Sequence, residues 1–127
     1  MSNMPQMGEF CWNELMTSDV KKAKDFYSAL FGWKYEDSQM GDMTYTMFKA
    51  GERNIGGMMQ TPPGYEQQIP PHWMGYVLVE NIETSVKKAE SLGAKVKVPV
   101  TVAGDYGRFS IIIDPTGAHI ALWQVMK

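Results

Sequence analysis

The sequence predicts a single α+β domain made of two tandem βαβββ modules. Three observations support this: a strand leading into a helix cap occurs twice, each helix stops at a glycine that leads into another strand, and each half closes with a hairpin. The halves align with an offset of 62 residues at their first strands and 64 at their last. Such self-similarity indicates a duplicated supersecondary unit.

Each half begins with a strand that runs into a helix cap, over residues 12–19 and 74–81. Asp19 and Asn81 are suitable N-cap residues, because their side-chain oxygens accept hydrogen bonds from free backbone N–H groups of the first helical turn. We therefore expect a helix after each of them.

The helices are amphipathic and end at Gly32 and Gly93, which suit a left-handed C-terminal cap. Apolar residues recur at helical spacing, and we expect them to face the core. They are Val20, Ala23, Phe26, Tyr27 and Leu30 in the first helix, and Ile82, Val86, Ala89 and Leu92 in the second.

Three strands complete each half. Residues 33–37 and 95–100 follow the helices, and the predicted hairpins are 45–50 with 55–60 and 108–113 with 118–125. The second hairpin turns at Asp-Pro-Thr-Gly, residues 114–117, in which Pro presets φ and Gly tolerates a positive φ. We expect one domain over 1–127, with module one at 8–60, a proline-rich link at 61–72 and module two at 73–125.

Composition excludes several classes of protein. Apolar residues make up 44% and charged residues 20% of the 127 residues, and the net charge is −2 with both signs interspersed. This favours a globular domain with neither nucleic acid nor a membrane as partner. The start of the chain does not resemble a signal peptide, and the single Cys11 favours a reducing cytoplasm.

Short motifs stand in a fixed order along the chain. They are TSD at 17–19, AKDFY at 23–27, LFGW at 30–33, GRF at 107–109, DPTG at 114–117 and ALWQ at 121–124. Together, over residues 8–124, they resemble the vicinal oxygen chelate superfamily, which includes glyoxalase I, extradiol dioxygenases and bleomycin-resistance proteins. The resemblance implies that the modules curve into a cupped, barrel-like mixed sheet that holds a small-molecule ligand.

The resemblance also implies metal-ligand positions on the first and last strands of each module. In this sequence those positions hold Trp12, Gly57, Met74 and Ala121. Indole, glycine and alanine offer no ligand atom, and thioether sulfur is a poor ligand for Mg, Mn, Fe(II) or Zn. We therefore expect neither a metal ion nor another cofactor.

Other catalytic arrangements are weakly supported. His72 lies in the link, and His119 starts a strand, where an exposed or structural histidine is the favoured interpretation. Cys11 falls on the face opposite Trp12, which favours a buried and inert thiol. The sequence contains no glycine-rich phosphate loop.

Strand alternation predicts the lining of the cup. The predicted ligand-binding residues are Trp12, Glu14, Met74, Tyr76, Phe109, His119 and Trp123, with Tyr45, Met47, Ile111 and Arg108 as further candidates. Such a lining suits a small apolar or aromatic molecule. The alternative is that these rings fill a closed core.

Glu14 is the residue of greatest interest. A carboxylate among Trp and Met side chains is desolvated, which raises its pKa. It could act as a general base or anchor a cationic ligand beside aromatic faces. A salt bridge to Arg108 or a lysine is the structural alternative.

Three hypotheses about function stay open, and no catalytic residue is assigned. The favoured one is a bleomycin-resistance-like protein that binds a small molecule without a metal. The others are an atypical lyase, isomerase or oxygenase that uses Glu14 with His119, and an interaction module with a filled cup. The resemblance and the sheet edges also favour a homodimer.

Overall fold

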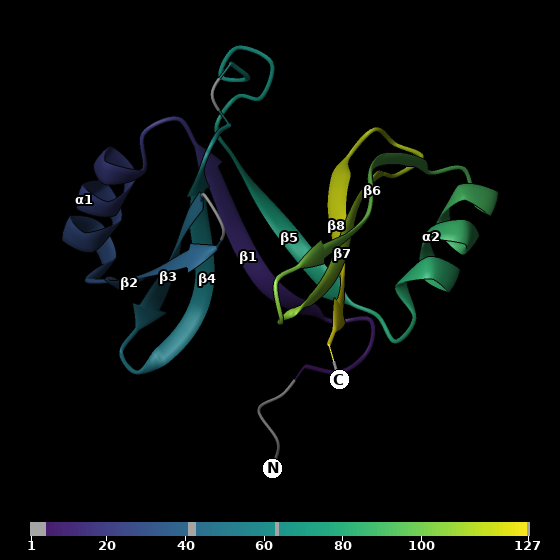
Figure 1. The fold of residues 1–127 in the computed structure, drawn as a ribbon, viewed down its shortest axis with the longest axis horizontal. Helices are drawn as coiled ribbons and strands as arrows, with labels where there is room; N and C mark the ends of the chain where they lie inside the picture. Colours follow the sequence, from purple (N-terminus) through teal and green to yellow (C-terminus); the bar gives the residue numbers. More distant parts are fainter. Residues whose placement is uncertain (1–4, 41–42, 63, 127) are drawn as a thin grey trace. The chain divides into compact units, whose positions relative to one another are not determined.

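The structure, a computed structural model, describes residues 5–40, 43–62 and 64–126. A strand, a helix and three strands occur in that order, and then the same set follows again (Figure 1). This confirms the predicted βαβββ–βαβββ order, although the strands differ from the predicted ones by a few residues at their ends. Module one contains β1 (Phe10–Thr17), α1 (Val20–Phe31), β2 (Lys34–Met40), β3 (Met43–Ala50) and β4 (Arg53–Gln60); module two contains β5 (His72–Leu78), α2 (Ile82–Ser91), β6 (Lys95–Ala103), β7 (Gly107–Ile113) and β8 (His119–Val125).

The four strands of module one form a mixed sheet in the order β2-β3-β4-β1. β1 and β4 run parallel, and β3 is antiparallel to both β2 and β4. Leu15, Phe48 and Met58 are at most 5% exposed and form the core against α1. Because side chains alternate along a strand, the residues next to them on β1, β3 and β4 belong to the opposite face, which we call the helix-free face.

Helix α1 begins and ends as predicted. The Asp19 carboxylate accepts a hydrogen bond from the Lys22 backbone N–H at 3.0 Å, and Gly32 is left-handed with φ of 74°. The predicted apolar stripe is partly wrong: Phe26 and Leu30 are 58% and 57% exposed. The helix contacts the sheet core through the narrower stripe of Val20, Ala23 and Tyr27, which leaves residues 26 and 30 on its flank.

Aromatic rings fill the helix side of module one. Trp33 stacks on Phe48, with centroids 4.6 Å apart, and on Tyr27 at 5.3 Å. Trp73, near the start of β5, stands at 88° to Phe48 and donates its indole N–H to the Tyr27 hydroxyl at 3.2 Å. These edge and stacked contacts stabilise the packing beyond the area they bury.

Module two has the same internal plan. Its sheet order is β5-β8-β7-β6, with β5 and β8 parallel and the other pairs antiparallel. Helix α2 lies beside this sheet in Figure 1, and Asn81 caps it by accepting from the Thr84 N–H at 3.0 Å. The core is Ile82, Val86, Ile112 and Leu122. Leu92 was predicted in the stripe but is 68% exposed, because it is the C-cap residue at the end of the helix.

The strand registers confirm the two repeat offsets. Glu14 of β1 lies opposite Gly57 of β4, and Tyr76 of β5 lies opposite Ala121 of β8. The repeat also explains two glutamines. Gln60 Oε1 accepts from the Val20 N–H at 3.3 Å, and Gln124 Oε1 accepts from the Ile82 N–H at 2.8 Å. Each last strand therefore carries a second cap for the helix of its own module.

The predicted Asp-Pro-Thr-Gly turn is confirmed. Asp114 Oδ1 accepts hydrogen bonds from the Thr116 hydroxyl at 2.6 Å, the Thr116 N–H at 2.8 Å and the Ala118 N–H at 3.0 Å. These bonds hold the pKa of Asp114 below its usual range, and the bond from the Thr116 hydroxyl has the largest effect. Gly117 takes a φ of 96°, which favours glycine.

Contacts divide the chain into two compact units, one of residues 12–74 and one that joins the residues before 12 to those after 74. Gly8 N–H donates to the Leu78 carbonyl at 2.8 Å, and Leu78 N–H donates to the Glu9 carbonyl at 2.9 Å. The beginning of β1 thus belongs to the unit that contains most of module two.

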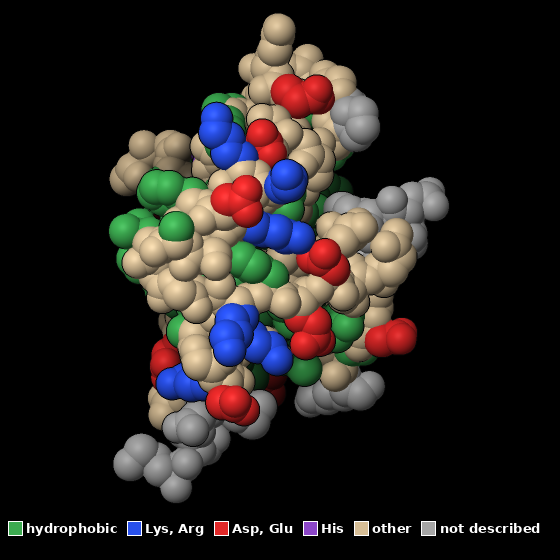
Figure 2. Space-filling model, turned by 90° about the vertical axis from the view of Figure 1, so that its left-hand side faces the viewer, with side chains coloured by type: hydrophobic (Ala, Val, Ile, Leu, Met, Phe, Trp, Pro, Cys, Tyr) green, Lys and Arg blue, Asp and Glu red, His purple; other side chains and the backbone are tan. Residues whose placement is uncertain are grey.

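Charges of both signs cover the side of the molecule on which α1 lies. Figure 2 shows Lys and Arg side chains there interleaved with Asp, Glu and hydrophobic side chains. Lys24 pairs with Asp37 at 3.1 Å on this side. Among the residues that the structure describes, no helix is long and apolar enough to span a bilayer.

Neighbouring strands leave no room for a side chain at Gly56, so a larger residue there should destabilise the protein. An added Cβ would collide with the Asn13 carbonyl and lie 2.5 Å from Phe48 Cζ, neither of which can move freely. We expect Gly56→Ala to lower the free energy of unfolding by about 1–3 kcal/mol, measured by urea denaturation. Gly75→Ala is the matched control, because its Cβ would meet the exposed Phe10 ring, and it should cost less than about 1 kcal/mol. Equal costs for the two variants would contradict this packing.

Candidate functional site

Three polar side chains on the helix-free face of module one form a continuous hydrogen-bonded chain. The Trp12 indole N–H donates to the Tyr45 hydroxyl at 2.8 Å, and the Tyr45 hydroxyl donates to Glu14 Oε2 at 2.8 Å. Trp12 and Glu14 project to one side because they are two residues apart on β1. All three residues are partly buried.

Gly57 makes room for this chain. It lies on β4, beside Glu14 on β1 and beside Met47 on β3. An added Cβ at Gly57 would collide with the hydroxyl and ring of Tyr45. A glycine is therefore required here by the position of the tyrosine ring and not by backbone conformation.

The electrostatics of the chain keep Tyr45 protonated. Burial first, and then the negative charge of Glu14, raise the pKa of Tyr45 well above its usual range. The phenol thus stays a hydrogen-bond donor to the carboxylate at every physiological pH.

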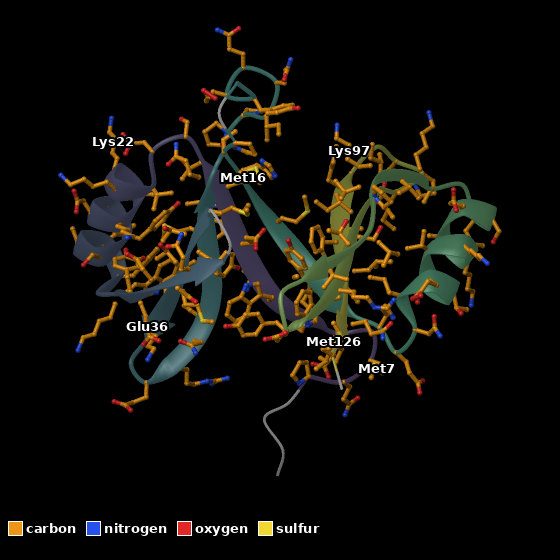
Figure 3. The ribbon with its side chains drawn as sticks, in the orientation of Figure 1. Met7, Met16, Lys22, Glu36, Lys97 and Met126 are labelled. Atoms are coloured by element: carbon orange, nitrogen blue, oxygen red, sulfur yellow. The ribbon has the colours of Figure 1, made fainter. Side chains whose placement is uncertain are left out.

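Methionines surround the polar chain. Met16, Met47 and Met59 alternate with the buried Leu15, Thr46, Phe48 and Met58, so they share the helix-free face, and each is partly buried. In Figure 3, Met16 lies on β1 while Lys22 extends from the outer side of α1, which marks the two sides of the module. Flexible, polarisable Met side chains adapt to ligands of different shape.

The equivalent face of module two is more apolar. The repeat places Met74, Tyr76, Phe109 and Ala121 at the positions of Trp12, Glu14, Tyr45 and Gly57. Met74 and Tyr76 are 7% and 6% exposed, and Tyr76 meets Trp123 edge-on at 6.4 Å. The carboxylate–phenol–indole chain is thus a property of module one.

Five of the seven predicted ligand-binding residues fall into two groups. The structure brings Trp12 and Glu14 together through Tyr45, and it places Tyr76 and Phe109 next to Trp123. The side chain of His119 is exposed at the start of β8. That these residues bind a ligand remains a prediction.

One candidate residue is on the wrong side of the sheet. Arg108 was predicted as a polar group of the cup or a partner for Glu14, but it binds Glu83 of α2 at 2.9 Å. Its register partner on β8 is Gln124, whose side chain caps α2, so both residues face the helix. Cys11 is half-buried with the thiol pKa raised by burial.

Sequence reasoning missed the central role of Tyr45, which it left among the further candidates. The informative feature was Gly57, a glycine in mid-strand, because such a residue often marks a close approach of another group. The repeat aligns Tyr45 with Phe109, so an aromatic ring stands at this position in both modules. Together with the glycine, this indicates that the Tyr45 ring lies over Gly57.

The metal positions implied by the family resemblance do not fit a metal ion. Trp12, Gly57, Met74 and Ala121 supply no oxygen or nitrogen ligand, and Tyr45 fills the space into which a ligand at position 57 would project. Among the residues described here, no three His, Cys, Asp or Glu side chains form a group that could hold a metal. We therefore derive no chemical step through a metal.

A cavity of about 320 Å³ lies elsewhere in this unit. It is lined by Asn13, Trp33, Phe48, Ile55 and Trp73, and no lining side chain is charged. Since Trp33 and Phe48 belong to the aromatic core under α1, this cavity opens on the helix side and is separate from the chain around Tyr45.

Sequence comparisons agree with the fold. The profile of the Glyoxalase/Bleomycin resistance protein/Dioxygenase superfamily matches residues 9–122. The "Putative glyoxylase CFP32" of Mycobacterium bovis and Mycobacterium tuberculosis is 37% identical over 131 residues, which cover 98% of this chain and 50% of that protein. The anthracycline biosynthesis protein DnrV of Streptomyces peucetius is 31% identical over 130 residues, 92% of this chain and 47% of that protein. The chain spans about half the length of these relatives.

Solved structures share the fold at low identity. The hypothetical protein BH1468 from Bacillus halodurans C-125 has a TM-score of 0.74 at 10% identity, over 96% of this chain and 97% of that one. Methylmalonyl-CoA epimerase from Mycobacterium tuberculosis has a TM-score of 0.69 at 12% identity, over 98% and 95%. A homoprotocatechuate 2,3-dioxygenase variant from B. fuscum has a TM-score of 0.64 at 14% identity, over 98% and 34%. These likenesses confirm the predicted fold class and do not identify a reaction.

The raised pKa of Tyr45 predicts an alkaline loss of stability. The unfolded chain loses its phenol proton near about pH 10, whereas the folded protein retains it at Tyr45. The contribution of the Tyr45 phenol to the free energy of unfolding is therefore complete below about pH 10 and declines as the pH rises further. We expect Tyr45→Phe to flatten this decline in urea denaturation midpoints between about pH 8 and 11.5. Tyr106→Phe, at an exposed tyrosine, should leave the decline as in the wild type, and a decline unchanged in Tyr45→Phe would contradict the prediction.

Proposed function

The chain belongs to the Glyoxalase/Bleomycin resistance protein/Dioxygenase superfamily, and we propose that it binds a small planar aromatic or cationic molecule without using a metal ion. The proposed site is the helix-free face of module one. The observation that carries the proposal is the hydrogen-bonded chain of Trp12, Tyr45 and Glu14, flanked by methionines.

The side chains of this face suit such a ligand. An indole offers a face for offset or edge-to-face stacking, and a cation over that face gains further attraction. The Glu14 carboxylate adds a charge-assisted hydrogen bond, which is stronger than a bond between neutral groups. Stacking, this bond and apolar burial together are enough for a dissociation constant of about 1 μM, or roughly −8 kcal/mol.

Two further considerations support the proposal. The relative DnrV is named for anthracycline biosynthesis, which agrees with an aromatic small molecule as ligand. The unpaired Cys11 fits a reducing compartment, so we propose that binding takes place in the cytoplasm. The enzyme hypothesis that pairs Glu14 with His119 has no comparable support, because His119 is exposed.

A screen of planar aromatic compounds tests the function. We expect hits that quench tryptophan fluorescence, raise the melting temperature and keep their affinity in EDTA. Glu14→Gln and Trp12→Ala should each weaken binding by roughly 10- to 100-fold, the effect of losing about 1.5–3 kcal/mol.

Trp73→Ala provides the matched control, because Trp73 is an exposed tryptophan that lines the helix-side cavity of the same compact unit. It should leave affinity unchanged. Loss of binding in Trp73→Ala with full binding in Trp12→Ala would place the ligand in the other cavity and refute the proposed site. Binding that disappears in EDTA would refute metal independence.

We also propose that the protein forms a homodimer through helix α1. Phe26, Leu30 and Phe31 are each at least 57% exposed on this helix, and exposed apolar side chains in one place often mark an interface. Light scattering at micromolar concentration should give a dimer mass, and Leu30→Lys should shift it towards a monomer. Leu92→Lys, at an exposed leucine of α2, should leave the dimer intact. A monomer in the wild type would contradict this proposal.

A further inference from the structure

The chain of Trp12, Tyr45 and Glu14 has one permitted direction. An indole nitrogen can donate a hydrogen bond and cannot accept one, so the Tyr45 oxygen must be the acceptor at 2.8 Å. Tyr45 has a single hydroxyl proton, which is then directed to Glu14 Oε2 at 2.8 Å. That oxygen of Glu14 must therefore act as an acceptor, as an ionised carboxylate does.

Packing fixes the donor in place. The Tyr45 hydroxyl and ring lie over Gly57, in the space that a Cβ would fill, and the ring is partly buried. Burial and the charge of Glu14 raise the pKa of Tyr45, so that the phenol keeps its proton. The direction of the chain therefore does not reverse within the working range of pH.

Two neighbouring strands of module one face Glu14. β3 brings Tyr45 towards it, and the facing stretch of β4 carries Gly57 and Met59, neither of which titrates. Farther out, Glu36 on β2 and Lys49 on β3 pair with each other at 3.4 Å.

On the helix side, Asp37 is held by the Thr46 hydroxyl at 2.6 Å and by Lys24 at 3.1 Å. Among the described residues of β1, β3 and β4, Glu14 is therefore the carboxylate that stands beside the indole of Trp12 on the helix-free face. A ligand on that face meets a carboxylate together with an aromatic ring.

We propose that Tyr45 is a positioning residue that holds Glu14 as an ionised carboxylate, so that this site selects aromatic cations over neutral aromatic molecules of the same shape. The inference rests on the proposed function, since it specifies which molecules that face binds. A hydrogen bond to the charged form of a carboxyl group favours that form. A cation held over an indole and beside a carboxylate gains both the quadrupole and the charge interaction.

Two probes of nearly equal shape test the selection by isothermal titration. 10-Methylacridinium is a permanent cation, so any pH dependence of its binding comes from the protein, and acridine is neutral at pH 8. We expect the wild type to bind the cation at least tenfold more tightly at pH 8 and to lose that binding as the pH falls. Glu14→Gln should remove both the selectivity and the pH dependence.

Tyr45→Phe is the decisive variant, because it keeps the ring and removes the donor. Without the hydrogen bond the carboxylate is protonated more easily, so the midpoint of the binding profile should move to higher pH by about one unit. Gly57→Ala should shift the midpoint in the same direction, because the added Cβ displaces the Tyr45 hydroxyl. This variant replaces Tyr45→Phe in the test if Tyr45→Phe folds poorly. Tyr106→Phe should leave the midpoint unchanged.

The outcomes separate the two proposals. Tight binding of 10-methylacridinium with an unshifted midpoint in both Tyr45→Phe and Gly57→Ala overturns the role of Tyr45 and leaves the proposed function standing. Equal affinity of the wild type for the two probes overturns only the claim that the site selects cations. No binding of either probe by the wild type overturns the proposed function and this inference with it.

Discussion

The parallel pairing of the first and last strands decides which side chains can meet in each module. It sets Glu14 beside Gly57 in one module and Tyr76 beside Ala121 in the other. A glutamine three residues further along each last strand binds the first N–H of the helix of its own module, so the same pairing also fixes where that helix starts against the sheet. One face of each sheet is thereby occupied by a helix, and the side chains of the opposite face are free to diverge.

That divergence has given the two modules different chemistry on a common frame. Glu14 and Tyr45 have Tyr76 and Phe109 as their equivalents, so the second module has neither the carboxylate nor the phenol that would bind it. The two changes belong together physically. A partly buried carboxylate without a donor is costly, and a phenol oxygen that points into an apolar face without a partner is costly as well. A polar chain is therefore expected to be gained or lost as a unit, which is why one module can be polar while its repeat is apolar.

Local sequence rules were sufficient for the elements of the fold. Asp19, Asn81 and the Asp-Pro-Thr-Gly turn act through contacts within a few residues, and the repeat aligns Gln60 with Gln124, which have the same capping role. Side-chain position was harder to predict where it depended on distant elements. A helical stripe does not reveal how much of its width a sheet will cover, so the exposure of Phe26 and Leu30 could not be read from periodicity.

The same limit explains Arg108 and Tyr45. Arg108 stands next to Phe109, a predicted ligand-binding residue, and its true direction follows from a register that pairs it with Gln124. Tyr45 reaches Glu14 across an intervening strand, and that strand admits the ring because Gly57 has no side chain. The face was predictable from alternation, but the hydrogen bond was not, because it depends on three strands at once.

This close fit between Tyr45 and Gly57 also bears on the relation to the catalytic members of the superfamily. A divalent metal would act on a substrate as a Lewis acid, and it would need ligand side chains at positions that here carry indole, thioether or no donor. A neutral phenol donates one hydrogen bond and cannot replace that function. It donates a hydrogen bond to a carboxylate beside an aromatic ring, and in our proposal this arrangement serves recognition. The likeness to the epimerase and the dioxygenase therefore extends to the fold. The chemistry of module one depends on Glu14 and on the close fit between Tyr45 and Gly57.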